Sequence, residues 1–330
     1  MKEIKISIIG FGSIGKGLVR EIIEKRDFLL RKGYDLKVVA IADKNSSEID
    51  INGLDLANVL KKEEYSYNKT ALDIIYEVKQ DIMVECTPSN IIDGNPGLSH
   101  ILAALNSRIN VVTSNKGPFV VAYDKIIESA DKNNVSIGYE ATVGGAIPII
   151  NLIKSNIRAD KILSIKGILN GTCNYILTRM QKEMLDYEEA LFEAKELGIA
   201  ETDESYDVKG IDTASKLVIL ANSLMKMNVK YTDVKVEGIT RITREALELA
   251  EEIDCTIKLI GEVNKEERLL RVAPRLVPFN HPLSVGGTLN VIMLNTDIAG
   301  EITITGRGAG PKETSSAILS DIINIADERL

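Results

Sequence analysis

Short apolar runs alternate with amphipathic stretches along the first 140 residues. Residues 4–9, Ile-Lys-Ile-Ser-Ile-Ile, predict a short buried strand, and residues 10–15 then open a helix whose apolar positions run from Leu18 to Ile23. Strands that alternate with helices in this order predict a parallel, doubly wound α/β sheet. The further strands are expected at residues 36–42, 82–86, 110–113 and 135–138, with helices at 101–106 and 123–132.

The pattern changes after residue 140. Residues 141–148 form a glycine bend that feeds a helix with a proline near its start. The rest predicts a second, α+β domain up to about residue 300, followed by a strand, a glycine turn and an amphipathic helix over residues 301–330. The expected strands are 161–169, 257–263 and 269–276, and the expected helices are 175–183, 187–197, 212–225 and 243–254.

Composition places the chain among ordinary globular proteins with small-molecule partners. Of its 330 residues 45% are hydrophobic and 27% are charged, which excludes disordered and collagen-like chains. The net charge of −8 gives no support to nucleic-acid binding.

The ends, apolar stretches and cysteines indicate a cytoplasmic protein. Residues 1–4 lead directly into a strand pattern without the apolar core of a signal peptide, and the uncharged stretch 276–296 is broken by prolines and glycines, so no membrane span is expected. Three scattered cysteines fit a reducing compartment and argue against structural zinc.

The clearest local motif is Gly10-x-Gly12-x-x-Gly15, between a predicted strand and a predicted helix. In this context the glycines allow a tight turn, close approach of a pyrophosphate and close helix packing. The motif therefore predicts a Rossmann-type domain that binds a dinucleotide. The alternative is a tight strand-to-helix turn without a ligand.

The end of the second predicted strand bears on the choice of coenzyme. Asp43 is the candidate for binding a ribose 2′-hydroxyl, although it lies further from Gly15 than the usual spacing. Lys44 and Asn45 follow it and could accept a 2′-phosphate if Asp43 turned away. NAD and NADP both remain open.

Lys116 follows the predicted strand 110–113, in the segment Ser-Asn-Lys-Gly-Pro. The carboxyl end of a strand is where doubly wound folds bind their ligands. Lys116 is therefore a candidate functional residue, and an ordinary solvated lysine is the alternative.

The densest polar segment, residues 198–216, runs from a glycine helix stop into a new helix. Asp212 and Lys216 are four residues apart and share one face of that helix. The local pattern alone favours a surface ion pair. A functional role would need both to face a pocket beside Glu201 and Asp207, where an amino-acid substrate could be held.

The cysteines allow one test of thiol chemistry. A thiolate nucleophile needs a basic partner, usually a histidine. Neither His100 nor His281 lies in a segment that suggests pairing with Cys86 or Cys173, so the thiols are expected to be small packed side chains. His281-Pro282 is read as a turn.

Five ordered segments together carry a more specific signal, and they cover nearly the whole chain. They resemble homoserine dehydrogenase, a family of NAD(P)-dependent enzymes that interconvert L-aspartate 4-semialdehyde and L-homoserine on the way to threonine, methionine and isoleucine. The segments are Ser114–Gly117, Glu140–Pro148, Leu169–Leu177, Gly198–Lys216, and His281–Leu283 with Gly306–Gly310.

The resemblance implies roles for the polar segment. Lys216 would donate the proton in aldehyde reduction, and Lys116 would stand near the cofactor and the reacting carbon. Hydride transfer to an aldehyde creates alkoxide character on oxygen, which an ammonium can protonate. In the reverse direction the lysine must be neutral, so homoserine oxidation is expected to rise toward alkaline pH. The substrate-binding residues implied are Gly198, through its backbone, with Glu201, Asp207 and Asp212.

The resemblance also implies a sodium ion, a set of coenzyme contacts and a homodimer. The cation would be held by the Glu140 carboxylate and by backbone oxygens of Val143, Gly145 and Ile147. By the same resemblance residues 1–140 bind the dinucleotide, residues 141–300 form the catalytic and dimerisation domain, and residues 301–330 pack back on the first domain. Beyond the glycines, the coenzyme contacts implied are Phe11, Ser13, Ile14, Asp43, Lys44, Thr87, Lys116 and Gly308.

Two departures from the family pattern matter. Glu204 stands where proline is common, which is expected to loosen the loop that holds Glu201. The chain ends at Leu330, so neither a C-terminal regulatory domain with threonine feedback nor a fused aspartate kinase is expected. The alternatives are a thiol-dependent semialdehyde dehydrogenase and a module that senses NAD(P) without turnover.

Overall fold

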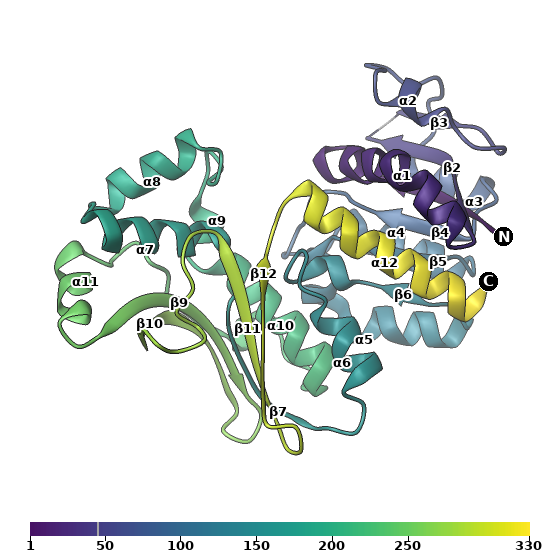
Figure 1. Ribbon diagram of the computed structural model, residues 1–330. Helices are drawn as coiled ribbons and strands as arrows, with labels where there is room; N and C mark the ends of the chain where they lie inside the picture. Colours follow the sequence, from purple (N-terminus) through teal and green to yellow (C-terminus); the bar gives the residue numbers. More distant parts are fainter. Residues whose placement is uncertain (45) are drawn as a thin grey trace. The chain divides into compact units, whose positions relative to one another are not determined.

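The computed structural model describes residues 1–44 and 46–330, and the chain divides into two compact units (Figure 1). The first unit comprises Met1–Gly145 together with Gly310–Leu330, and the second comprises Ala146–Ala309. Residues 301–309 therefore lie in the second unit, whereas the rest of the C-terminal stretch lies in the first. None of the helices among the described residues is long and apolar enough to cross a bilayer.

The first unit is built on a six-stranded sheet in the order β3-β2-β1-β4-β5-β6. Its central strands are short and almost wholly buried, which is typical of a sheet covered on both faces. The strands are β1 (Lys2–Ile9), β2 (Tyr34–Asp43), β3 (Ser46–Ile49), β4 (Ile82–Glu85), β5 (Asn110–Thr113) and β6 (Ile137–Gly138).

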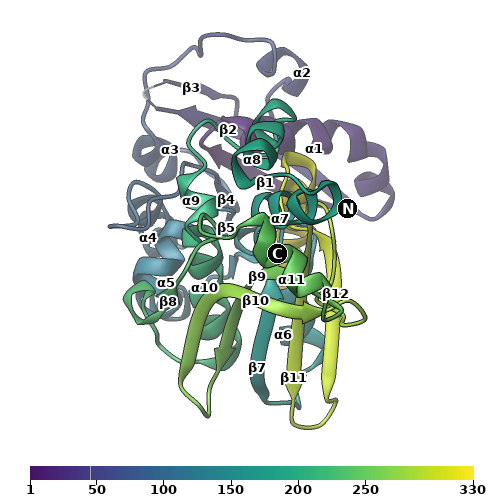
Figure 2. The same ribbon diagram turned by 90° about the vertical axis from the view of Figure 1, so that its left-hand side faces the viewer.

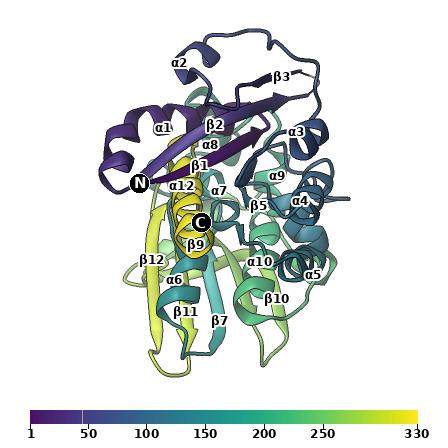
Figure 3. The same cartoon turned by 90° about the vertical axis from the view of Figure 1, so that its right-hand side faces the viewer.

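Helices cover both faces of this sheet, as Figure 3 shows, with α1 and α12 on one side and α4 and α5 on the other. This arrangement confirms the expected doubly wound α/β fold. The helices are α1 (Ser13–Arg31), α2 (Leu56–Val59), α3 (Ala71–Glu77), α4 (Gly97–Asn106), α5 (Lys116–Asn133) and α12 (Pro311–Arg329), with a 3-10 turn η1 (Glu140–Thr142).

One edge of the sheet differs from the expected parallel arrangement. β3 pairs with β2 antiparallel, with Asp43 opposite Ser46. The reason is the connection, because a link of two residues can join only antiparallel strands, whereas a parallel pair needs a long crossover. The other neighbouring pairs of this sheet, β2–β1, β1–β4, β4–β5 and β5–β6, are parallel.

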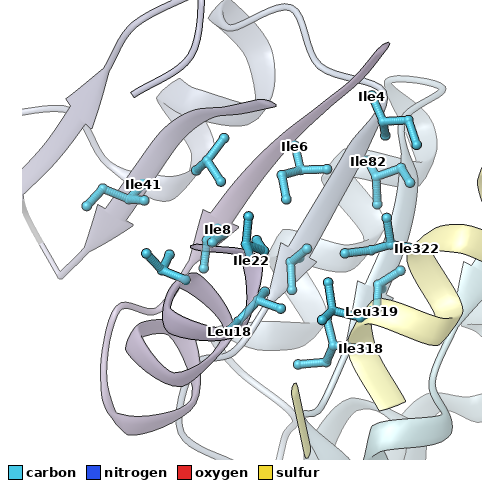
Figure 4. Packing of buried hydrophobic residues seen from close by; sticks show 14 of the residues in the cluster. Ile4, Ile6, Ile8, Leu18, Ile22, Ile41, Ile82, Ile318, Leu319 and Ile322 are labelled. Atoms are coloured by element: carbon cyan, nitrogen blue, oxygen red, sulfur yellow. The ribbon is translucent and has the colours of Figure 1, made fainter. Parts of the chain in front are cut away.

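The core of the first unit is completed by the end of the chain. Apolar side chains of β1, α1 and α12 form one cluster, seen closely in Figure 4. Burying each such side chain contributes roughly 1.5–3 kcal/mol, so α12 is a structural part of this unit. The labelled members include Ile4, Ile6, Ile8, Leu18, Ile22, Ile318, Leu319 and Ile322.

The second unit contains another six-stranded sheet, in the order β12-β11-β7-β9-β10-β8, visible in Figure 2. All neighbours are antiparallel except β10 and β8. The strands are β7 (Ile162–Ile168), β8 (Lys235–Val236), β9 (Cys255–Asn264), β10 (Leu269–Pro278), β11 (Leu289–Thr296) and β12 (Glu301–Arg307).

The helices of the second unit confirm its α+β character. One of them, α10, is buried over most of its length because its sequence is apolar on nearly every side. The helices are α6 (Ile149–Asn156), α7 (Gly171–Glu183), α8 (Tyr187–Glu196), α9 (Ser205–Val208), α10 (Ile211–Met225) and α11 (Arg244–Glu251), with the 3-10 turn η2 (Tyr231–Asp233).

Candidate functional site

The three glycines of the first turn each meet a different physical need. Gly10 has φ +90°, and a Cβ there would lie 2.6 Å from the Cys86 carbonyl carbon. A Cβ on Gly15 would lie 2.4 Å from the Gly10 oxygen, whereas Gly12 has nothing within 4 Å of its Cβ position. Gly12 therefore leaves open space at the start of α1, where a helix N-terminus attracts an anion. The glycine loop fits a dinucleotide pyrophosphate.

The neighbours of these glycines differ in what they can offer a ligand. Phe11 is 1% exposed and packs edge-on against Tyr65, with ring centroids 6.0 Å apart. Its side chain belongs to the core, so only its backbone can face a coenzyme. Ser13 is exposed and Ile14 is half-buried at the first turn of α1.

Asp43 ends β2 and is half-buried, and Lys44 follows it with φ +43°. Asn45 lies outside the described residues. Burial, and then the charges of nearby acids beginning with Asp43, raise the pKa of Tyr65. Tyr65 is therefore a neighbour of the candidate ribose-binding acid, and no local signal in the sequence pointed to it.

A buried carboxylate joins the loops that follow β4 and β5. Glu85 is fully buried, and its Oε1 accepts hydrogen bonds from the backbone N–H of Thr87, at 3.1 Å, and from the Thr87 hydroxyl. Its Oε2 accepts from the Thr113 hydroxyl at 3.3 Å. Glu85 could not be singled out from the sequence, because an acid at the end of an apolar strand pattern carries no sign of a functional role.

Asn115 continues this network into α5. Its backbone N–H donates to the Thr113 hydroxyl at 2.9 Å, and its Nδ2 donates to the Thr87 hydroxyl at 3.3 Å. Its Oδ1 accepts from the N–H of Gly117 at 3.1 Å and so caps α5. Lys116 is the first residue of that helix, so it lies at the carboxyl end of β5, as predicted.

The two candidate thiols are unsuited to nucleophilic chemistry. Burial, and then the charge of Glu85, raise the pKa of Cys86 to about 12. Burial and the charges of Asp207 and Asp212 raise the pKa of Cys173 well above its usual range. Both thiols therefore stay protonated, whereas a nucleophilic cysteine needs a lowered pKa.

The second unit holds a buried ion pair on α10. The Lys216 ammonium donates to the Asp212 carboxylate at 2.7 Å and to the Leu169 carbonyl at 2.6 Å. Lys216 is 7% exposed and Asp212 is 4% exposed. The local expectation of a surface pair is therefore wrong, because α10 is enclosed on most sides.

Asn170 links this pair to a second carboxylate. Its Nδ2 donates to Asp212 at 2.9 Å and to Asp207 at 2.7 Å, while its Oδ1 accepts from the N–H of Cys173 and caps α7. The structure thus brings together four polar groups, of Asp207, Asn170, Asp212 and Lys216. Asn170 is a residue that sequence reasoning placed in a motif without giving it a role.

The other candidate substrate-binding residues, Gly198 and Glu201, lie in the segment between α8 and α9. Glu201 is exposed and stands outside this network, and Gly198 has φ +67°, a conformation that favours glycine. Glu204 pairs with Lys195 of α8 at 2.6 Å, and its carbonyl accepts from the N–H of Asp207 at 2.9 Å. Glu204 therefore ties the loop to α8 through an ion pair, and the expected loosening of the loop relative to a proline stays a prediction.

Three of the four residues proposed for a cation, Glu140, Val143 and Gly145, lie at the end of the first unit. Glu140 is 2% exposed and precedes a bend in which Gly144 and Gly145 have φ +82° and +54°. Ile147 belongs to the second unit. Within the described part of the chain no three acids, histidines or cysteines gather as a metal cluster, so a cation here would rely on one carboxylate and carbonyl oxygens.

Gly308 lies in the second unit, just beyond β12. A Cβ there would fall 1.8 Å from Nδ2 of Asn290, so any side chain would displace that asparagine. The close packing explains the glycine without a ligand.

Two family models match the chain. The model for the homoserine dehydrogenase NAD-binding domain matches residues 10–140, and the homoserine dehydrogenase model matches residues 148–323. Homoserine dehydrogenase of Methanocaldococcus jannaschii is 52% identical over 97% of this chain and 98% of its own length. The chain belongs to the homoserine dehydrogenase family.

Solved structures of the homoserine dehydrogenase family have the same fold. A putative homoserine dehydrogenase from Archaeoglobus fulgidus is 45% identical, with a TM-score of 0.92 over 98% of this chain and 99% of that one. A hyperthermophilic archaeal homoserine dehydrogenase solved in complex with NADPH is 28% identical, with a TM-score of 0.85 over 100% and 99% of the two chains. The glycine loop described above thus belongs to an NAD(P)-binding domain.

Proposed function

We propose that this protein is an NAD(P)-dependent homoserine dehydrogenase that interconverts L-aspartate 4-semialdehyde and L-homoserine in the cytoplasm, on the route to threonine, methionine and isoleucine. The observation that carries the proposal is the buried Lys216–Asp212 pair, set in a chain of this family. A buried ammonium held by a carboxylate is suited to proton transfer at a substrate oxygen.

Lys216 is the proton donor when the aldehyde is reduced. Two of the three N–H bonds of its ammonium are directed to Asp212 and Leu169, which leaves the third for the substrate oxygen. Asp212 holds the ammonium in place and compensates its charge. In the oxidation direction the neutral amine accepts the proton of the homoserine hydroxyl, so the oxidation rate rises toward alkaline pH.

Carboxylates beside this pair bind the amino group of the substrate. Asp207 and Asp212 share the Nδ2 of Asn170, so the amide keeps the two like charges in a common network. Glu201 is exposed on the loop before α10 and is free to reach a substrate ammonium, and Gly198 lines the site with its backbone.

The first unit binds the coenzyme, which supplies or accepts the hydride. The backbone of residues 10–15 holds the pyrophosphate. Thr87 follows β4 and Lys116 begins α5 after β5, and hydrogen bonds of Glu85 and Asn115 to Thr87 join these two segments. Asp43 and Lys44 at the end of β2 contact the adenosine ribose. The carboxylate of Asp43 repels a 2′-phosphate, whereas the ammonium of Lys44 attracts one.

A sodium ion is bound by Glu140 with the carbonyl oxygens of Val143, Gly145 and Ile147. One buried carboxylate with neutral oxygens matches the charge of a monovalent hard cation. Sodium chloride should therefore raise the unfolding temperature above that in choline chloride at equal ionic strength. Glu140→Gln should remove this difference, and an equal response of both proteins would contradict the site.

The active form is a homodimer joined through the second unit. β12 is an edge strand of the second sheet, and its residues alternate between exposed and half-buried. An edge of this kind can pair with a copy of itself across a two-fold axis. Sedimentation of the protein should give twice the mass of the chain.

The test of the activity follows the absorbance of reduced nicotinamide when L-homoserine is added with NAD or NADP at alkaline pH. Homoserine-dependent reduction that is absent in Lys216→Ala supports the proposal, and the faster coenzyme identifies the preference. Rates that stay flat from about pH 7 to about pH 10, with chemistry limiting, would contradict the role of Lys216. Coenzyme binding without turnover would instead support a sensing module.

A further inference from the structure

A cavity lies in the second unit, among residues that the proposed reaction does not use. It has a volume of about 430 Å³ and is formed by α7, α11, β9 and the loop that follows β10. This volume is within the range of small-molecule sites. Its lining includes Thr178, Gln181, Lys182, Glu251, Lys258 and Phe279.

The cavity lining includes a buried lysine. Lys258 on β9 is 4% exposed, and its ammonium donates to Oδ1 of Asn174 at 2.9 Å and to the hydroxyl of Thr178 at 3.2 Å. Both partners are neutral. A buried ammonium without a compensating carboxylate is costly, and it can make one more hydrogen bond.

The cavity lining contains a second donor group, the side-chain amide of Gln181. Gln181 is joined to the Thr256 hydroxyl through its Oε1, whereas its buried Nε2 has no hydrogen-bond partner within the described chain. Buried donors are normally satisfied, so each exception needs an explanation. The Nε2 amide of Gln181 and the ammonium of Lys258 are thus two donors to which a single acceptor group could bind.

The charges and apolar surface of the cavity limit the ligand. Lys182, Lys258 and Glu251 are its charged residues, so the lining carries a net charge of one positive unit. Phe279 is 46% exposed and supplies an apolar wall with Val285. A single negative charge attached to an apolar group matches this lining, whereas a dianion would meet Glu251 without full compensation.

The turn at His281-Pro282 holds one wall of the cavity. The N–H of Leu283 donates to the ring Nδ1 of His281 at 3.1 Å, and the N–H of Ser284 donates to the His281 carbonyl at 2.8 Å. These bonds order the start of the loop that contributes Ser284 and Val285 to the lining. The wall is thus formed before any ligand binds.

We propose that this cavity binds a small organic monocarboxylate, whose carboxylate contacts the ammonium of Lys258 and the amide of Gln181 and whose apolar end lies against Phe279. Binding here requires neither coenzyme nor homoserine, so the proposal stands apart from the proposed activity.

Protonation of Lys258 gives the site a pH dependence. Burial, and then the nearby charge of Lys182, lower the pKa of Lys258 to about 8. The charged groups around it are Lys182 from α7 and Glu251 from α11, which line the cavity, and Arg275 of β10, its cross-strand partner. A carboxylate binds the protonated form, so its affinity should fall at least about tenfold between about pH 7 and about pH 10.

The test is calorimetric titration of the full chain with isovalerate near neutral pH, beside isoamyl alcohol and inorganic phosphate. We expect isovalerate to bind and the neutral alcohol not to bind. Binding should be lost in Lys258→Met and weakened about fivefold in Lys182→Gln, while Lys161→Gln, at an exposed lysine of the same unit, should bind as the wild type does.

Three outcomes would overturn the proposal. They are the absence of isovalerate binding at millimolar concentrations, binding that is unchanged in the cavity variants, and binding of phosphate without isovalerate. If Lys258→Met does not fold, Lys182→Gln and Gln181→Leu decide the question, since both alter the cavity without removing the buried ammonium.

Discussion

The second unit contains two lysines that are buried to the same degree but have different partners. Lys216 on α10 is 7% exposed and donates to the carboxylate of Asp212, whereas Lys258 on β9 is 4% exposed and donates only to neutral oxygens. A buried charge is costly unless an opposite charge compensates it.

The comparison indicates that the chemical role of a buried lysine depends on whether its hydrogen-bond partner is a carboxylate or a neutral group. Asp212 compensates the charge of Lys216, so an ammonium is available at the proposed reaction site. Lys258 has no such partner within the described chain, and burial lowers its pKa to about 8. The first environment suits proton donation, and the second suits the binding of an anion from outside.

The largest expected effect separates the two lysines by their roles in catalysis. Lys216→Met should lower kcat for homoserine oxidation by about a thousandfold or more, because the proton acceptor is lost, with little change in coenzyme affinity. Lys258→Met should keep kcat within about threefold, because Lys258 is outside the proposed reaction site. Steady-state kinetics and coenzyme titration measure both. Equal losses of kcat in Lys216→Met and Lys258→Met would contradict the separate roles proposed for the two lysines.

The next effect concerns stability and its dependence on pH. The folded-state pKa of Lys258 is about 8 and its ordinary value is 10.5, so between these values the unfolded chain binds more protons. The free energy of unfolding should therefore rise with pH across this window, and the cost of burial, about 3 kcal/mol, is fully present below about pH 8.

The matched measurement is denaturant unfolding of wild type and Lys258→Met from about pH 7 to about pH 10. The wild type should gain stability relative to the variant as pH rises, since other groups titrate equally in both proteins. A difference that stays constant with pH would show that burial does not lower the pKa of Lys258.

The burial of Lys216 is what local sequence patterns could not predict. The spacing of Asp212 and Lys216 correctly placed them on one helix face, but it favoured a surface pair. Asn170, which orders the site, bonds to side chains 37 and 42 positions away in the chain. Such contacts depend on the packing of α7 against its neighbours and leave no periodic signal.

The fold itself was more accessible from the sequence. The apolar run 110–113 is β5 as predicted, and the glycine motif stands between β1 and α1 as predicted. β11 was missed, because Leu289–Thr296 lies in a stretch rich in proline, glycine and asparagine and becomes a strand by pairing with β7 and β12. Local propensity predicts elements well where they are continuous, and less well where distant pairing creates them.

The first unit offers a third buried charged group for comparison, the Glu85 carboxylate, whose proposed role is to position the segments that follow β4 and β5. Glu85→Gln should raise the KM for the coenzyme about tenfold with kcat changed less than threefold, because an amide cannot accept from Thr87 and Thr113 with both of its terminal atoms. Asp81→Asn is the control, since Asp81 accepts from the N–H of Lys5 at 2.7 Å and lies before β4, at the opposite end of that strand from Glu85. A fall in kcat alone would indicate a role in the chemical step.

The smallest expected effect concerns the loop before α10. Glu204 has φ −79°, which proline also adopts, so the φ angle of this residue permits Glu204→Pro. It removes the ion pair with Lys195, and exposed pairs of this kind contribute only about 0.2–1 kcal/mol. The lost pair and the stiffer backbone act in opposite directions, so KM for homoserine should change less than about threefold. Lys195→Met breaks the same pair without adding a proline, and a much larger KM change there than in Glu204→Pro would mean that the ion pair, rather than the backbone, shapes the loop beside Lys216.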